Sequence, residues 1–401
     1  MTNEQVLQIL GRRRSVFASD VASHRQALMD AFVPARTLVI GGAGSIGSAV
    51  VARLFGFGVR SLHVVDLTEN GLVEVVRDLR SSLGYTTKDF RTFAVDFLSP
   101  EFEALVKVHG PYDYVLNFSA LKHVRSEKDP FTLGRMLNTN IGGAHRVIEL
   151  LESGQAHSAF SVSTDKACRP VNAMGATKRW MEVVLFGSTT PGRVTSSRFA
   201  NVAFSDGSLL QGFERRLAKR QPIAVPTDIR RFFLTPDESA WLCLMAAAIG
   251  KTCEIFVPKT DTGFDDVPLL EIAERFLRVH EIKPRLLESE ADAREMATRM
   301  GNRPAEWPVF AFTSDTTGEK EAEEFIDESE RVESDRFAEI DVIVAGPVEK
   351  SRKTASDAAW RSVQDAITRR SLDRGELLSR IHEVVPEFTH FETGKYLDDK
   401  M

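Results

Sequence analysis

The stretch that decides the fold is a short apolar run followed by a glycine-rich turn, Thr37-Leu38-Val39-Ile40-Gly41-Gly42-Ala43-Gly44-Ser45-Ile46-Gly47. The apolar run is typical of a buried strand, and residues 48–55 are typical of a helix. In a strand–turn–helix unit, the first two glycines of GxxGxxG permit a tight turn near a pyrophosphate, and the third lets helix and strand pack closely. Free N–H groups at the helix start also favour phosphate. The sequence therefore predicts a dinucleotide-binding turn with cofactor contacts at Gly41, Gly44, Ser45, Ile46 and Gly47.

An acidic residue follows the next predicted strand, residues 62–65, at Asp66. A carboxylate at that point accepts hydrogen bonds from the ribose hydroxyls of NAD and would repel the 2′-phosphate of NADP. Since no arginine follows at once, the sequence favours NAD, with NADP as the alternative. Asp66 could also cap the helix expected near Asn70, and the two roles are compatible.

Strands and helices alternate along the chain, with further strands expected at residues 93–97, 114–117, 157–163 and 194–199. This alternation predicts an α/β protein with a doubly wound parallel sheet and a smaller C-terminal lobe. We expect a helical arm over residues 1–35, a cofactor domain over 36–200 with interleaved later strands, a substrate lobe over 201–345 and a helical extension over 346–401. The run 341–344 is expected to be a late strand of the smaller lobe.

Polar side chains gather where the strand 157–163 ends, in the stretch Ser163-Thr164-Asp165-Lys166. A helix restarts near Met174, and Met174 and Lys178 are four residues apart, so they share a helical face. Open α/β sheets bind ligands at the carboxyl ends of their strands. We therefore expect one crevice to hold Thr164, Asp165, Lys166, Met174 and Lys178. The alternative is a capped helix start with Asp165 and Lys166 paired on the surface.

Composition narrows the class of protein. The 401-residue chain has a net charge of −6 and therefore no basic footprint for nucleic acid. Its three cysteines have no CxxC spacing, which argues against a disulfide framework or a metal site. The N-terminus lacks the shape of a signal peptide, and the longest apolar run, residues 241–249, is too short to span a bilayer. We expect a soluble cytoplasmic protein.

Three other segments carry simpler expectations. The triplet Arg12-Arg13-Arg14 is expected to be a solvated turn, and Ser19 with Asp20 could cap a helix of the N-terminal arm. The acidic stretch 314–341 is expected to be a solvated helix, with a nucleotide contact at Gly318, Glu319 and Lys320 as the alternative. The tail is expected to form a helical hairpin, and a homo-oligomer contact there is a hypothesis.

These motifs resemble an extended short-chain dehydrogenase/reductase, and more narrowly the CapD-like polysaccharide-biosynthesis group of nucleotide-sugar 4,6-dehydratases. The resemblance covers residues 37–275. It is carried by the glycine turn and by residues 119–124, 139–140, 163–166, 169–179, 198–202, 228–235 and 255–259.

The resemblance implies a substrate, a cofactor and further contacts. Members typically convert UDP-N-acetylglucosamine to a 4-keto-6-deoxy sugar, with NAD reduced and reoxidised in each turnover. The implied further cofactor contacts are Asp96, which is placed to meet an adenine edge, and Phe97, Ser119, Ala120, Lys122, Asn140, Ser163 and Lys178. The implied substrate contacts are Lys122, Asn201, Arg231 and Lys259. Arg230 beside Arg231 suggests a two-arginine phosphate clamp, with two surface arginines as the alternative.

Elimination of water needs an acid and a base close together. On this hypothesis, Asp165 protonates the departing 6-OH, and Lys166 removes the C5 proton with a pKa lowered by burial. Thr164 bonds the 4-oxygen, Lys178 holds the nicotinamide ribose, and Met174 is an apolar wall.

The sequence departs from the family pattern at two places. Met174 replaces the tyrosine that most short-chain dehydrogenases use as a base, as it does in some members of this dehydratase group. Residues 316–320 read Thr-Thr-Gly-Glu-Lys in place of Arg-Pro-Gly-Glu-Lys, which leaves the identity of the sugar nucleotide open. A nucleotide-sugar 4-epimerase and a non-catalytic nucleotide-sugar binding protein are the alternatives.

Overall fold

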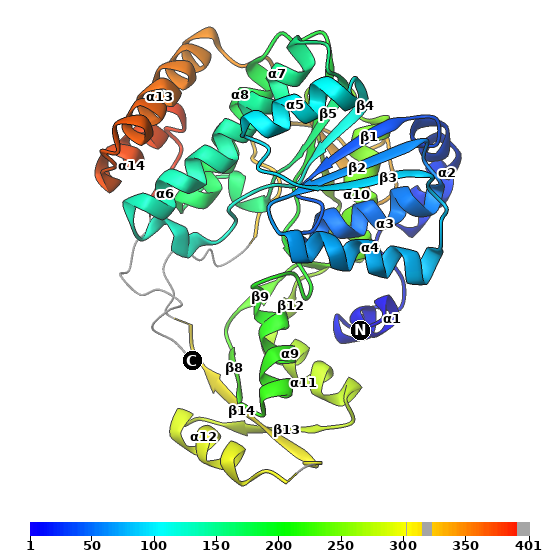
Figure 1. The fold of residues 1–401 in the computed structure, drawn as a ribbon. Coiled ribbons are helices and arrows are strands. Elements are labelled where there is room, and N and C mark those ends of the chain that lie inside the picture. The colour runs from blue at the N-terminus through cyan, green and yellow to red at the C-terminus, as the bar shows by residue number, and fades with distance from the viewer. Residues whose placement is uncertain (302, 315–322, 391–401) are drawn as a thin grey trace.

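A nine-stranded sheet forms the centre of the computed structural model, which describes residues 1–301, 303–314 and 323–390 (Figure 1). Its order is β15-β16-β11-β6-β5-β4-β1-β2-β3, and the strands from β11 to β3 are all parallel. The strands are β1 (Arg36–Ile40), β2 (Ser61–Asp66), β3 (Asp89–Ala94), β4 (Tyr112–Asn117), β5 (Ala156–Val162), β6 (Arg193–Ser197), β11 (Glu254–Pro258), β15 (Arg331–Glu333) and β16 (Ile340–Val344). The predicted doubly wound α/β fold is confirmed.

Two predicted strands need correction. The run 341–344 belongs to β16, which pairs antiparallel with β11 at the end of the large sheet and is not part of the smaller lobe. An apolar run does not encode its partner, so this pairing was hidden in the sequence. The strand expected at residues 93–97 is β3, which ends at Ala94 and leaves Asp96 in the following turn.

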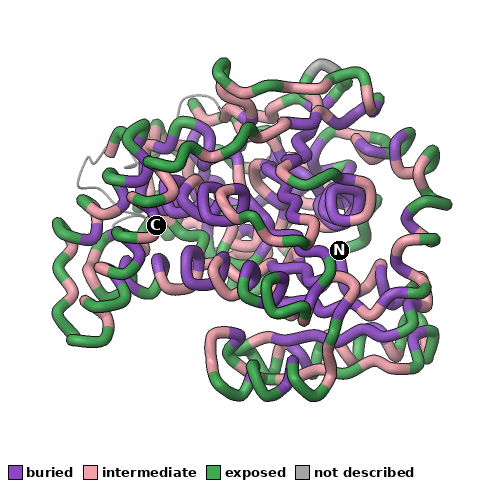
Figure 2. Tube along the Cα trace, turned by 90° about the horizontal axis from the view of Figure 1, so that it is seen from above, coloured by how far each residue is buried: buried purple, intermediate pink, exposed green. Residues whose placement is uncertain are grey.

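Helices cover both faces of the large sheet (Figure 1). One face carries α3 and α4 with α10 beside them, and the other carries α5, α7 and α8. These helices and their neighbours are α2 (Ala18–Phe32), α3 (Ser45–Phe57), α4 (Glu69–Leu83), α5 (Pro100–His109), α6 (Pro130–Leu137), α7 (Gly143–Glu152), α8 (Ala173–Gly187) and α10 (Pro236–Ile249). Buried residues follow the central strands and the helices against them, while exposed residues mark the outer helices (Figure 2).

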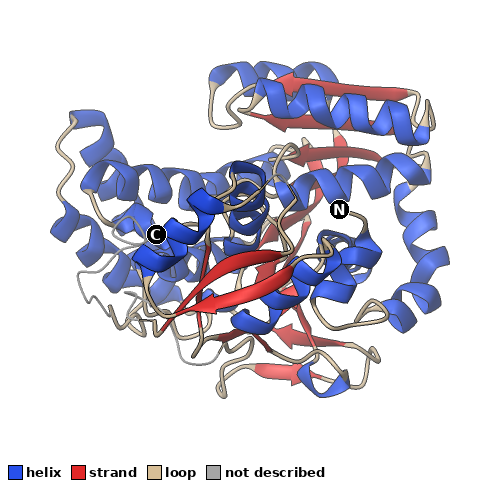
Figure 3. Ribbon diagram, turned by 90° about the horizontal axis from the view of Figure 1, so that it is seen from below, coloured by secondary structure: helices blue, strands red, loops and turns tan. Residues whose placement is uncertain are grey.

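A smaller lobe projects from one end of the large sheet and has its own apolar core (Figures 1 and 3). Its parallel sheet has the order β13-β14-β8. The lobe contains β8 (Ile223–Pro226), β13 (Lys283–Leu287), β14 (Glu306–Phe312), α9 (Leu209–Lys219), α11 (Leu269–Val279) and α12 (Glu290–Arg299). Two pairs of short strands lie where the smaller lobe meets the large-sheet domain. β7 (Asn201–Val202) pairs with β10 (Phe233–Leu234), and β9 (Arg230–Arg231) pairs with β12 (Val267–Pro268).

The N-terminal arm packs on this same chain. Helix α1 (Asn3–Ile9) lies against α11, and α2 lies against α10. The prediction of a solvated arginine turn is wrong for Arg12, whose guanidinium binds Glu238 at 2.9 Å in the capping box of α10. Asp20 is buried and accepts hydrogen bonds from the backbone N–H groups of residues 338 and 339, so it is not a helix cap.

The C-terminal helices form the predicted hairpin. Helices α13 (Lys350–Arg369) and α14 (Arg374–Val384) pack on each other and on α8, and the indole of Trp180 donates a hydrogen bond to Ser356 in α13. No helix within the described ranges is both long and apolar enough to cross a membrane. The four-part division of the chain and the homo-oligomer contact stay predictions.

Candidate functional site

The carboxyl ends of the parallel strands bring the predicted motifs to one edge of the sheet. The glycine turn follows β1, residues 118–122 follow β4, and residues 163–166 follow β5. The strand order reverses between β1 and β4, which is where doubly wound sheets bind dinucleotides.

The glycine turn has the geometry that a bound pyrophosphate needs. Gly41 has φ +76°, and a Cβ there would lie 2.7 Å from the backbone nitrogen of Ser119. A Cβ at Gly47 would lie 2.1 Å from the carbonyl oxygen of Gly41, so α3 packs directly on the turn. Gly44 is the N-cap of α3, and no side chain caps the helix there. No capping side chain therefore competes with a phosphate for the backbone N–H groups of Ser45 and Ile46 at the start of the helix. The turn therefore fits a dinucleotide phosphate.

The predicted ribose contact lies beside this turn, and the predicted adenine contacts follow β3. The carboxylate of Asp66 accepts hydrogen bonds from Ala43 N at 2.9 Å and Thr68 N at 2.9 Å, so it fixes the turn to the end of β2. Asp96 is exposed after β3 and accepts a hydrogen bond from Leu98 N. Phe97 is buried and packs edge-on against Phe102.

The loop after β4 is held by Asn140, which sits in a π-helical turn over residues 138–142. Its side chain bonds both the N–H and the C=O of Leu121, and its amide also donates to Thr177. Asn140 therefore shapes the loop that carries Ser119 and Ala120. Lys122, from the same loop, donates to Ser205 at 3.5 Å and so reaches toward the substrate lobe.

The acid–amine pair lies at the end of β5, as expected. Lys166 Nζ is 3.1 Å from both oxygens of Asp165, and the hydroxyl of Thr164 donates to Asp165 at 2.7 Å. Asp165 is 3% exposed, whereas Lys166 keeps 31% of its side-chain surface accessible. Asp165 is therefore not part of a surface pair as in the alternative interpretation, although part of the Lys166 side chain stays accessible.

The protonation of Lys166 differs from expectation. Burial lowers the pKa of Lys166, but the charges of Asp165 and Glu323 outweigh it and raise the pKa above its ordinary value. The prediction of a lowered pKa is therefore wrong for this arrangement. Two carboxylates near one amine favour the ammonium form.

Glu323 is the residue that the sequence did not reveal. Its carboxylate is 5% exposed, lies 3.8 Å from Lys166 Nζ and 3.6 Å from Arg231 Nε, and accepts hydrogen bonds at 2.8 Å from Asn201 and from Phe232 N. The prediction of a solvated acidic helix is wrong here, because residues 323–330 contain no helix and the side chains of Glu323 and Glu330 are only 5% and 11% exposed. The alternative nucleotide contact at Gly318, Glu319 and Lys320 lies outside the described residues.

Helix α8 supplies Met174 and Lys178 from one buried face. Lys178 donates to the carbonyl oxygen of Val162 at 2.9 Å, and burial lowers its pKa to about 8 although Glu182 opposes the change. A Cβ at Gly175 would lie 2.2 Å from the carbonyl oxygen of Lys166, so only glycine lets α8 approach the acid–amine turn this closely.

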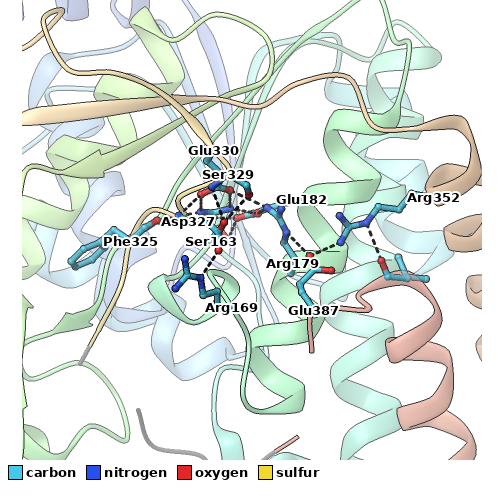
Figure 4. A network of polar contacts seen from close by, with 12 residues as sticks. Ser163, Arg169, Arg179, Glu182, Phe325, Asp327, Ser329, Glu330, Arg352 and Glu387 are labelled. Carbon is cyan, nitrogen blue, oxygen red and sulfur yellow. Dashed lines mark hydrogen bonds and ion pairs between the residues drawn. The ribbon is translucent and has the colours of Figure 1, made fainter. Parts of the chain in front are cut away.

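Behind the site lies a buried network of ion pairs (Figure 4). Arg198 is fully buried and binds Glu182 and Glu330, each through two hydrogen bonds of 2.7–2.8 Å. Burial would raise the pKa of Glu182, but Arg198 and Arg179 lower it to about 2. Ser163, predicted at the cofactor, donates its hydroxyl to Glu182 at 2.7 Å, so this side chain faces the network. A charged residue inside the apolar run 180–186 was the available signal for Glu182.

The predicted substrate residues divide into two groups. Asn201 and Arg231 lie together around Glu323. Lys259 follows β11 and donates to the carbonyl oxygen of Ser334 at 2.8 Å. The two-arginine clamp is not formed, because Arg230 pairs with Asp266 at 2.9 Å, and adjacent residues of a strand face opposite sides.

Comparison with known proteins gives a family and several relatives. A family model described as polysaccharide biosynthesis protein matches residues 37–344. An uncharacterised membrane protein of Methanocaldococcus jannaschii is 32% identical over 55% of this chain and 66% of its own length. The probable polysaccharide biosynthesis protein EpsC of Bacillus subtilis is 28% identical over 67% of this chain and 46% of its own length. A UDP-glucose 4-epimerase of Rickettsia typhi is 28% identical over 61% of this chain and 72% of its own length. The chain thus spans less than two thirds of the first two relatives.

Solved structures show the same fold. Pen from Bacillus thuringiensis superposes with a TM-score of 0.61 at 22% identity, covering 80% of this chain and 90% of Pen. DesIV, a dTDP-glucose 4,6-dehydratase from Streptomyces venezuelae solved with NAD and TYD bound, gives a TM-score of 0.51 at 16% identity, covering 70% and 88% of the two chains. The expected extended short-chain dehydrogenase/reductase fold is confirmed.

Proposed function

Because the chain belongs to the polysaccharide biosynthesis protein family, we propose that it is a nucleotide-sugar 4,6-dehydratase that acts on UDP-N-acetylglucosamine with NAD as its cofactor. The observation that carries the proposal is the acid–amine pair at the end of β5, with Lys166 Nζ 3.1 Å from Asp165 and Thr164 bonded to the same carboxylate. Elimination of water needs such a pair, because one group must accept the C5 proton while another protonates the departing O6.

The cofactor half of the site supports NAD, with NADP as the alternative. The turn from Gly41 to Gly47 and the start of α3 would hold the pyrophosphate, and Asp66 would meet the adenosine ribose. DesIV, a fold relative and itself a 4,6-dehydratase, contains NAD. When bound in this site, NAD supplies the acceptor for the hydride from the sugar C4 and the donor that returns it at C6.

The protein groups divide the proton work. Thr164 bonds the sugar 4-oxygen. Moving one proton across the 3.1 Å contact from Lys166 Nζ to Asp165 leaves a neutral amine as the C5 base and a carboxylic acid for O6. As C4 is oxidised, Thr164 passes the 4-OH proton to solvent. After elimination, the amine holds the C5 proton and the carboxylate is ionised again. Lys166 then returns that proton to C5 as C6 is reduced and takes up one proton from solvent, so the pair regains its starting charge. Lys178 holds the nicotinamide ribose, Met174 walls the pocket, and Lys122, Asn201, Arg231 and Lys259 are the substrate contacts.

A nucleotide-sugar 4-epimerase is the second candidate, and the Rickettsia typhi relative favours it. Epimerase chemistry in this fold relies on a tyrosine base and needs no elimination pair, whereas this chain has Met174 at that position and Asp165 beside Lys166. These residues favour the dehydratase.

One incubation separates the candidates. Purified protein is mixed with UDP-N-acetylglucosamine, and the product is analysed by mass spectrometry. Loss of one water supports the dehydratase. An unchanged mass with inverted C4 would indicate an epimerase, and unchanged substrate would indicate a non-catalytic binding protein.

A further inference from the structure

We propose that Glu323 is a positioning residue of this site, which sets the protonation state of Lys166 through its own charge and ties that state to the substrate-contact residues Asn201 and Arg231. The proposal rests on the function proposed above and adds a group to it from a distant part of the chain.

Glu323 contacts both the acid–amine pair and the substrate-contact residues. Glu323 enters the site between the end of β5 and β9, and both of its oxygens are used: Oε1 accepts from Asn201 Nδ2 and Oε2 from Phe232 N, each at 2.8 Å. The same carboxylate lies 3.8 Å from Lys166 Nζ and 3.6 Å from Arg231 Nε. It is therefore the group that links the acid–amine pair to the substrate contacts.

Several contacts anchor the segment that bears Glu323. Two residues further along, the carbonyl oxygen of Phe325 accepts from Arg198 at 3.1 Å, and the Phe325 ring packs edge-on against Phe232. Asp327 binds Arg169 at 2.5 Å (Figure 4). Glu330 binds Arg198 at 2.8 Å. A carboxylate on so well-anchored a segment has a defined distance to Lys166.

The charges around Glu323 control its own ionisation. The charged groups that face Glu323 are Asp165 and Lys166 after β5 and Arg231 of β9. Burial, together with the charge of Asp165, raises the pKa of Glu323 to about 7 despite the two cations. Near neutral pH its charge therefore changes readily. When Glu323 is ionised, it holds Lys166 as an ammonium; when Glu323 is protonated, Lys166 can pass its proton to Asp165.

The test measures the ionisation of Lys166 directly. Lys166 keeps 31% of its side-chain surface accessible. Its amine is labelled with acetic anhydride, and mass spectrometry of its peptide gives the extent of labelling against pH. In Glu323→Gln, we expect the labelling midpoint of Lys166 to fall by about one pH unit or more, because an opposite charge within about 4 Å is removed. The matched control is Glu324→Gln, since Glu324 is the adjacent acid and pairs with Arg169 at 3.6 Å. The control should leave the midpoint unchanged.

The second readout is the pH profile of turnover with UDP-N-acetylglucosamine. In wild type, turnover should fall as the pH rises and Glu323 ionises. In Glu323→Gln, this fall in turnover should be absent. Glu323→Asp keeps the carboxylate, so the fall in turnover with rising pH should be present again. A purely structural role would lower activity equally at every pH.

The two proposals fail in different ways. An unmoved Lys166 midpoint in Glu323→Gln would overturn the role of Glu323, even if wild type dehydrates the sugar. A wild type that forms no dehydrated product would overturn the proposed function, and the Lys166 midpoint would still decide the role of Glu323.

Discussion

Replacing Arg198 with methionine tests the buried network that supports the site. Arg198 is fully buried and gives Glu182 two hydrogen bonds of 2.8 and 2.7 Å. Arg198→Met keeps much of the side-chain volume but leaves the buried carboxylate of Glu182 with only Arg179 and Ser163. Removing one partner of a buried ion pair costs about 3–5 kcal/mol, because the remaining charge is uncompensated.

The pKa of Glu182 gives a similar magnitude. Arg198 and its neighbours lower this pKa from 4.5 to about 2 against the effect of burial. At 1.36 kcal/mol per pH unit, the change corresponds to about 3 kcal/mol of folding stability. Because the folded pKa lies below the unfolded value, this stability is fully present above about pH 4.5 and is lost as the pH falls through about 2.

The assay is urea denaturation followed by circular dichroism at pH 7 and at lower pH. We expect Arg198→Met to lose about 3 kcal/mol at pH 7, and the difference from wild type to narrow between pH 4.5 and 2. The matched control is Arg278→Met, because Arg278 forms an exposed ion pair with Glu274, which is worth less than about 1 kcal/mol. If Arg198→Met were no less stable than this control, the reasoning about the network would be wrong.

Three further predictions concern the site itself. Lys166→Ala should abolish loss of water from the sugar while NAD still binds, as measured by product mass and by cofactor retained after gel filtration; surviving turnover would remove Lys166 from the chemistry. Met174→Leu should keep most of the activity, because Met174 is a buried apolar wall and leucine conserves its volume, and a loss of more than about tenfold in kcat would point to a role for the thioether. Gly47→Ala should weaken NAD binding by at least about tenfold in titration calorimetry, since its Cβ would lie 2.1 Å from the Gly41 oxygen, and unchanged affinity would contradict the close packing of α3 on the turn.

Local features of the site were predictable from the sequence. The glycine turn and the end of β5 are continuous stretches, and their chemistry depends on neighbours within a few residues. The spacing of Met174 and Lys178 fixes one helical face in the same way. The fold class, the cofactor and the acid–amine pair were predicted from these local features.

Features that depend on distant contacts were not predictable. Glu323 meets Asn201 across 122 positions of sequence, and its acidic neighbourhood resembles a solvated helix. The raised pKa of Lys166 follows from Asp165 and from this distant carboxylate, so the direction of the shift could not be read from residues 163–166 alone. Arg12 likewise gains a buried partner, Glu238, 226 positions away.

The most direct test of the account uses UDP-N-acetylglucosamine that carries deuterium at C4. The account predicts a product lighter by one water with the deuterium at C6, because the hydrogen removed from C4 returns to the carbon that loses its hydroxyl. Asp165→Asn should form none of this product. A wild-type product of unchanged mass, whether or not C4 is inverted, would contradict the assignment of Asp165 and Lys166 as an elimination pair.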